Sequence, residues 1–195
     1  IGQVIGYVGL TDMGVGAALM TYASRMVRSS GPEELSRLSS TALIIQSGLG
    51  LIGLLAAISI APFFDRLVES GGVDTKVVAA TVVVAGVAWF VKTALNTFDQ
   101  LLVAHQEIHL NYIIGFISHL FRLLLIVLLL WLGVGLVGLA VAAFLANSLL
   151  VLLAIHYLKP IAPNLEVRTS LFDRGFANKL LSFSIWGTLG RLAAT

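Results

Sequence analysis

The stretch LLLIVLLLWLGVGLVGLAVAAFLANSLLVLLAI, residues 123–155, decides the fold class of this chain. It holds no charged residue, and its one break is the glycine-rich segment Gly133–Gly138. A helix needs about 20 apolar residues to cross the hydrocarbon core of a bilayer, which is about 30 Å thick. The stretch therefore predicts two membrane-spanning helices that are joined by a tight turn.

The rest of the chain has the same character. Of its 195 residues, 58% are hydrophobic and only 11% are charged, whereas soluble domains carry about 25% charged residues. Thr41–Phe64 contains no charge, and Val77–Val91 is also uncharged. We therefore predict an all-α fold, a polytopic transmembrane helix bundle.

Hydropathy and helix-breaking residues divide the chain into six helical segments. We expect these segments at residues 1–28, 33–62, 77–104, 113–132 and 136–158, with a sixth that opens at Leu180. Residues 1–158 then form five spans, residues 159–179 a cytoplasmic linker, and residues 180–195 the start of a further helix. Because the chain begins at Ile1 and stops within an apolar run, we expect it to be a fragment.

The orientation follows from lysine and arginine, which are in excess in short cytoplasmic loops. Only Arg66 and Lys76 flank the second connection. The first and fifth connections are flanked or filled by Arg25, Arg28, Arg37, Lys159, Arg168, Arg174 and Lys179. We therefore predict that the first, third and fifth connections are cytoplasmic and that the amino-terminal edge is on the outer side.

Charges at membrane depth cost about 2.5–3.5 kcal/mol on insertion scales, so each one is a candidate functional position. Lys92, Asn96, Asp99 and Gln100 are spaced by four, seven and eight residues, which places them on one face of the third span. That face could line a polar cavity. Alternatively, Lys92 neutralises Asp99 or extends toward the headgroups.

Arg122 lies about ten residues into the fourth span and shares a face with Ser118 and with Asn111 or Gly115. A guanidinium group presents a fork of donors that suits phosphate and stays charged at physiological pH. Arg122 is therefore a candidate anion contact, and the alternative is an ion pair with Asp99 on the neighbouring helix.

Two further positions carry a prediction. Asp12 lies among glycines in the phrase GLTDMGVG, where its carboxylate could hold a cation or a basic side chain, although close helix packing is the favoured explanation of the glycines. Asn147 in the fifth span is expected to form an interhelical hydrogen bond.

Other patterns predict no site. The basic residues form no patch for nucleic acid, and the chain has no cysteine for disulfides or metal binding. Gly133–Gly138 matches GxGxxG without the βαβ context of a nucleotide site. His105 and His109 lie one turn apart, but Glu107 is out of place for an HExxH motif. With no catalytic constellation, we predict neither an enzyme nor a bound cofactor or metal.

Three stretches resemble bacterial polysaccharide biosynthesis membrane proteins, the O-antigen and oligosaccharide flippases of the multidrug/oligosaccharidyl-lipid/polysaccharide exporter superfamily. They are Tyr7–Arg25 with its aspartate–glycine core, Asn96–Leu139, and Leu171–Phe176 followed by Leu180–Trp186. On this resemblance the chain corresponds to helices two to six of the family's amino-terminal lobe and the start of helix seven. The family's second helix runs inward, which agrees with the orientation predicted from charge.

The resemblance implies a two-lobed transporter of the cytoplasmic membrane that flips a lipid-linked oligosaccharide or polysaccharide precursor by alternating access, as in lipopolysaccharide synthesis. It implies that Arg122, Lys92 and Arg25 are candidate contacts for a polyprenyl diphosphate. Asp12 and Asp99 are candidates for coupling to H⁺ or Na⁺. The implied partners are membrane lipid and the glycan polymerase and glycosyltransferases of the same pathway.

Two other functions remain open. A cation-coupled multidrug exporter of the same superfamily would prefer carboxylates in its cavity, so the mixed charges of Lys92, Asp99 and Arg122 favour the flippase. An intramembrane enzyme acting on lipid-linked sugars would need an interfacial acidic or histidine cluster. His105, Glu107 and His109 form the only such group in the sequence.

Overall fold

The computed structural model describes residues 14–29, 31–63 and 74–193, with side chains up to Ile185. Throughout these ranges the regular structure is helical, without a strand, so the predicted all-α class is confirmed. The helices are α2 (Val15–Ser29), α3 (Pro32–Ile60), η1 (Ala61–Phe63), α5 (Thr75–Ala104), α6 (Ile108–Trp131), α7 (Leu136–Ile161), η2 (Thr169–Leu171) and α8 (Arg174–Ala193). Gly133 and Gly135 have φ of 74° and 64° in the turn between α6 and α7, as the sequence predicted.

Four helices are long and apolar enough to cross a membrane. They are Pro32–Phe63, Thr75–Ala104, Ile108–Trp131 and Leu136–Ile161. Two predicted boundaries are wrong, because α6 begins at Ile108 rather than at Ile113 and α8 begins at Arg174 rather than at Leu180. Helix α8 starts early because Oδ1 of Asp173 accepts hydrogen bonds from the backbone N–H groups of Gly175 (2.6 Å) and Phe176 (3.2 Å).

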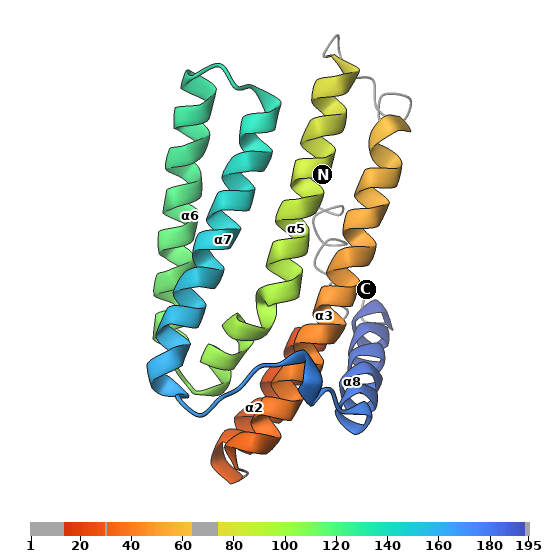
Figure 1. The fold of residues 1–195 in the computed structure, drawn as a ribbon, viewed down its shortest axis with the longest axis vertical. Coiled ribbons are helices and arrows are strands. Elements are labelled where there is room, and N and C mark those ends of the chain that lie inside the picture. Colours follow the sequence, from red (N-terminus) through yellow and green to blue (C-terminus); the bar gives the residue numbers. More distant parts are fainter. Residues whose placement is uncertain (1–13, 30, 64–73, 194–195) are drawn as a thin grey trace.

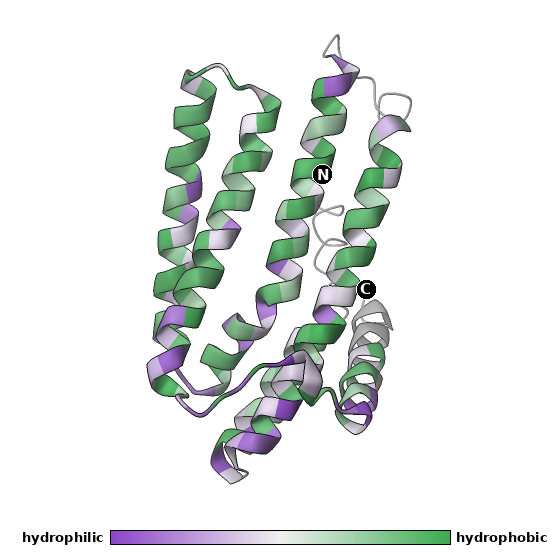
Figure 2. Ribbon diagram, viewed as in Figure 1, coloured by the Kyte–Doolittle hydropathy of each residue, from purple (hydrophilic) through white to green (hydrophobic). Residues whose placement is uncertain are grey.

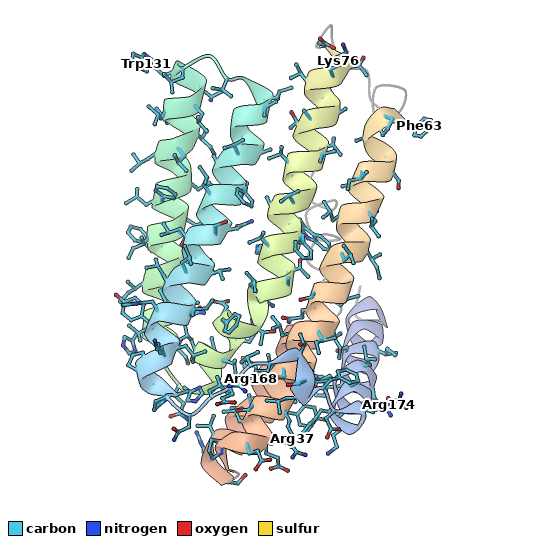
Figure 3. The ribbon with its side chains drawn as sticks, in the orientation of Figure 1. Arg37, Phe63, Lys76, Trp131, Arg168 and Arg174 are labelled. Carbon is cyan, nitrogen blue, oxygen red and sulfur yellow. The ribbon has the colours of Figure 1, made fainter. Side chains whose placement is uncertain are left out.

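The two ends of the bundle differ in composition. Arg37, Arg168 and Arg174 lie at one end, hereafter the basic end, whereas Lys76, Phe63 and Trp131 lie at the opposite end (Figure 3). Hydrophilic residues are concentrated at the basic end, and the upper halves of the long helices are largely hydrophobic (Figure 2). The first and fifth connections therefore meet at one end, which is the end predicted to be cytoplasmic.

The buried core also lies toward the basic end, where all six α-helices come together (Figure 1). Each helix contributes at least one nearly fully buried apolar side chain, and these include Leu19, Leu38, Leu101, Ile114, Leu158 and Leu180. The core therefore ties the short helices α2 and α8 to the four long ones.

Helix α5 lies at the centre of the bundle, between α3 and α7 (Figure 1). Glycines allow its close approach to α3. A Cβ atom at Gly86 would stand 2.7 Å from the Cβ of Ala57, and a Cβ at Gly53 would overlap the indole ring of Trp89. Without a strong hydrophobic drive between helices in lipid, such small residues let dispersion contacts form.

The α3–α5 contact gives a first prediction. We expect Gly86→Ala to destabilise the protein by about 1–3 kcal/mol, because the Ala57 Cβ is fixed to the backbone and the helices must separate. Gly48→Ala is the control, since a Cβ there meets nothing within 4 Å. Its helix propensity makes it neutral or stabilising by up to about 1 kcal/mol. Thermal unfolding in detergent micelles measures both; equal effects would contradict the predicted close contact.

Polar side chains connect α5 to its neighbours. Oγ1 of Thr97 donates to Oε1 of Gln46 on α3 at 2.6 Å, and both side chains are fully buried. On the other side of α5, Nδ2 of Asn147 donates to the backbone carbonyl of Ala88 at 2.9 Å. The predicted interhelical hydrogen bond of Asn147 is therefore confirmed.

The Thr97–Gln46 bond gives a second prediction. Thr97→Val keeps the shape of the side chain but leaves Oε1 of Gln46 without its donor, so we expect a loss of about 1–3 kcal/mol. Gln46→Leu combined with Thr97→Val should recover most of this loss, because no buried polar atom is then left unpaired. Unfolding free energies of the two single variants and the double variant measure the coupling. Strictly additive effects would contradict the bond.

Candidate functional site

The structure places the predicted site residues on three helices. Lys92, Asn96 and Asp99 lie on α5, Arg122 lies on α6, and Arg25 lies near the end of α2. Lys92, Arg122 and Arg25 are exposed, whereas Asn96 and Asp99 are half-buried. Asp12 lies outside the described residues.

Asp99 is paired with an amide and not with a cation. Nδ2 of Asn111, in the first turn of α6, donates to Oδ1 of Asp99. Among the described residues, the ion pairs of Asp99 with Lys92 and with Arg122 that the sequence allowed are not formed. Figure 1 shows the last turns of α5 departing from the axis of the rest of the helix toward the lower ends of α6 and α7. Asp99 is five residues before the end of α5, and Asn111 is in the first turn of α6.

The turn between α5 and α6 fixes this contact. Gln106 has φ of 66°, the left-handed conformation that commonly ends a helix. The N–H of Glu107 donates to the carbonyl of Leu102 at 3.1 Å, and the N–H of Gln106 donates to that of Val103 at 2.9 Å. Helix α6 can therefore begin at Ile108, early enough for Asn111 to reach Asp99.

The Asp99–Asn111 bond is a reference for the positions of Lys92 and Arg122 around their helices. At about 100° per residue, Lys92 lies within about 20° of Asp99 around α5, and Arg122 lies within about 20° of Asn111 around α6. Each cation is therefore on the face of its helix that carries the bond. We call these two faces together the α5–α6 polar face, defined by Lys92, Asp99, Asn111 and Arg122.

The two cations also lie at similar depth. Measured along each helix at about 1.5 Å per residue, Lys92 lies about 18 Å before Ala104 and Arg122 about 21 Å after Ile108. Both distances are near half the thickness of a bilayer core plus its interface. Helix α7 packs against both α5 and α6, so it holds the two helices that carry the cations.

The structure adds His119 to the polar residues of α6, and it places Arg25 on a different part of the bundle. His119 is exposed one turn before Arg122, and its polarity within an apolar helix was the signal that could have found it. Arg25 belongs to α2, which packs against α3, α5 and α8, and it is not brought to the α5–α6 polar face. Ser118, on the same stripe as Arg122, is 3% exposed, and its Oγ has no hydrogen-bond partner.

The histidines of the α5–α6 turn have local partners. Nδ1 of His105 lies 2.8 Å from the carbonyl of Leu101, and Nδ1 of His109 lies 3.4 Å from Oε2 of Glu107. Over the part of the chain that the structure describes, no three histidine, aspartate or glutamate residues are grouped so that they could hold a metal ion.

The exposed surface of the long helices defines the class of this protein. Phe116, Leu124 and Trp131 of α6 are 70%, 61% and 82% exposed, and contiguous apolar surface of this kind marks contact with lipid or with another protein. The chain is a multi-pass α-helical membrane protein. Comparisons with family models, with curated proteins and with solved structures give no match.

The α5–α6 polar face gives a third prediction. Since the chain has no cysteine, single cysteines can be placed without background. We expect a membrane-impermeant thiol reagent to label Arg122→Cys and Lys92→Cys, because a charged side chain at membrane depth needs an aqueous surrounding. Leu124→Cys is the matched control: it is exposed at nearly the same depth but faces the opposite side of α6. Equal labelling of residues 122 and 124 would contradict a wet polar face.

Proposed function

We propose that this protein is a transporter that moves a lipid-linked oligosaccharide or polysaccharide precursor across the cytoplasmic membrane by alternating access. The observation that carries this proposal is the pair of exposed cations, Lys92 on α5 and Arg122 on α6, each on the side of its helix that also carries a partner of the Asp99–Asn111 bond. The resemblance of three sequence stretches to oligosaccharide flippases supports the same function.

The chemistry of the two cations suits the diphosphate of a polyprenyl carrier. A cation that faced lipid at this depth would cost about 2.5–3.5 kcal/mol, so an aqueous path or an anionic ligand has to compensate. Arginine offers two parallel N–H donors to phosphate oxygens, and lysine adds a compact positive charge. The carrier's diphosphate would thus bind between helices while its glycan crosses the membrane.

Asp99 is the candidate group for coupling to H⁺ or Na⁺ among the described residues. Its carboxylate is half-buried, and one oxygen accepts from Asn111. Like Lys92, it lies on the α5–α6 polar face, so protonation or cation binding at Asp99 would change the charge beside the proposed anion contact. Transport that depends on a cation gradient would follow from this arrangement.

The test is complementation with the full-length protein in its host after deletion of the gene. We expect Arg122→Ala to reduce delivery of the glycan to the outer leaflet by about tenfold to a hundredfold, as loss of a charged hydrogen bond implies. Arg122→Lys should retain part of the activity, because it keeps the charge and loses the fork. Leu124→Ala, at the same depth on the opposite face, should retain full activity. Surface glycan and lipid-linked glycan left in the inner leaflet are the two measurements.

The same experiment separates the alternatives. If deletion leaves surface glycan unchanged, the flippase is excluded, and a simultaneous loss of drug resistance would identify the cation-coupled exporter. If alanine at His105, Glu107 and His109 abolishes function, the intramembrane enzyme is favoured, since a flippase should largely tolerate this change.

A further inference from the structure

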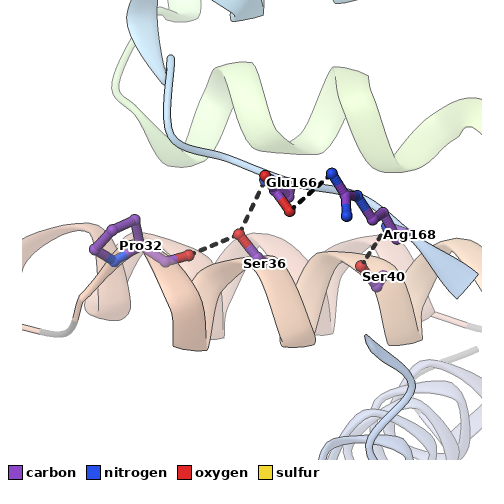
Figure 4. A network of polar contacts seen from close by, with 5 residues as sticks. All are labelled: Pro32, Ser36, Ser40, Glu166 and Arg168. Atoms are coloured by element: carbon purple, nitrogen blue, oxygen red, sulfur yellow. Dashed lines mark hydrogen bonds and ion pairs between the residues drawn. The ribbon is translucent and has the colours of Figure 1, made fainter. Parts of the chain in front are cut away.

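Residues 162–173, hereafter the strap, connect α7 to α8 and run along α3. Three backbone N–H groups of the strap donate to hydroxyl oxygens of α3, each over 3.0 Å: Glu166 to Ser36, Arg168 to Ser40 and Asp173 to Thr41. Figure 4 shows the first two of these contacts. These residues are about 130 positions apart in sequence, so the contacts are tertiary and not local.

The spacing of the first two contacts fits an extended chain segment that runs along a helix. Ser36 and Ser40 are four residues apart on α3, or about 6.0 Å along its axis. Glu166 and Arg168 are two residues apart, or about 6.6 Å in an extended chain, and their N–H groups point to the same side. Arg168 has φ −135° and ψ 142°, which is extended backbone. The two repeats match, so N–H groups two residues apart on the strap meet hydroxyls four residues apart on α3.

The hydroxyls are oriented to accept. Oγ of Ser36 donates to the carbonyl of Pro32 at 2.7 Å, and Oγ1 of Thr41 donates to that of Arg37 at 2.8 Å. These two hydroxyls therefore donate their own hydrogen within α3 and present an oxygen to the strap, and Oγ of Ser40 accepts from the strap in the same way. Ser36, Ser40 and Thr41 are 3%, 0% and 0% exposed, so water cannot easily replace a lost oxygen.

The far end of the strap connects α3 to α8. The N–H of Asp173 binds Thr41, while its carboxylate caps the first turn of α8. Helix α8 packs against α2 and α3, although it follows α7 in the chain. The Glu166–Arg168 ion pair, at 3.3 Å with both side chains largely exposed, adds little to this attachment.

We propose that Ser36, Ser40 and Thr41 form a latch that holds the strap on α3, so that α8 moves with α3 and can move independently only when the latch opens. The latch is a conformational device at the basic end of the bundle. The latch does not depend on which molecule the protein transports, so its test is independent of the test of the proposed function.

The test uses the full-length protein in detergent micelles, with any cysteine outside residues 1–195 replaced by serine. Spin labels at Glu34→Cys on α3 and Asn178→Cys on α8, both exposed, report the distance between the two helices. Trypsin cleavage after Arg168, read by mass spectrometry, reports opening of the strap. We expect Ser40→Ala and Thr41→Val to broaden the spin-label distances and to raise the cleavage rate about fivefold each, because each leaves one strap N–H unpaired.

Two matched controls isolate the latch. Ser39→Ala removes an equally buried hydroxyl that donates only to the carbonyl of Leu35 within α3, so it should leave both measurements unchanged. Thr41→Ser keeps the hydroxyl and should behave as the unaltered protein. If Ser40→Ala fails to fold, Ser36→Ala replaces it.

Two results would overturn the proposal. The first is cleavage and distances in Ser40→Ala and Thr41→Val that equal those of the unaltered protein. The second is an equal effect of Ser39→Ala, because the changes would then reflect loosening of α3 as a whole. A selective effect of the latch positions, with Thr41→Ser unaffected, supports it.

Discussion

Hydrocarbon offers no hydrogen-bond partner, so every polar group on a membrane-spanning helix must be satisfied within the protein or at a wet surface. Three interhelical bonds meet this constraint in part: Thr97 with Gln46, Asn147 with the carbonyl of Ala88, and Asn111 with Asp99. Among the described residues, Nε2 of Gln46 and Oγ of Ser118 are buried without a partner. They lie in three different interfaces, and α5 takes part in all of them. The arrangement of the bundle therefore depends on α5 and on the polar side chains that fix its neighbours.

The same constraint distinguishes the candidate site from the rest of the bundle. Lys92 and Arg122 are exposed at mid-depth, and within the described ranges neither forms an ion pair. Asn111 takes the place that a cation could have occupied beside Asp99, which leaves both positive charges available. These two cations are the basis of the proposed path for an anionic headgroup. At the basic end, by contrast, the polar groups are paired within the protein, because buried hydroxyls of α3 accept hydrogen bonds from N–H groups of the strap.

The sequence predicted much of the fold because its signals are local. The span at Val77–Ala104, the turn at Gly133–Gly135 and the bonding role of Asn147 are each visible in short stretches. The predicted start of α8 at Leu180 was wrong because Asp173 caps the helix earlier. The early start of α6 was missed because it depends on the left-handed Gln106 and on the turn that this residue closes.

By itself the sequence determined that apolar runs cross a membrane and that most basic residues gather at one end, since both follow from the transfer of each residue between water and lipid. It also placed Lys92 and Asp99 on one face, because helical periodicity is fixed. Only the tertiary structure decided that Asp99 binds Asn111 and that Ser36, Ser40 and Thr41 bind the strap. A hydrogen bond needs two groups about 3 Å apart, and the distances between residues remote in sequence are set by helix packing.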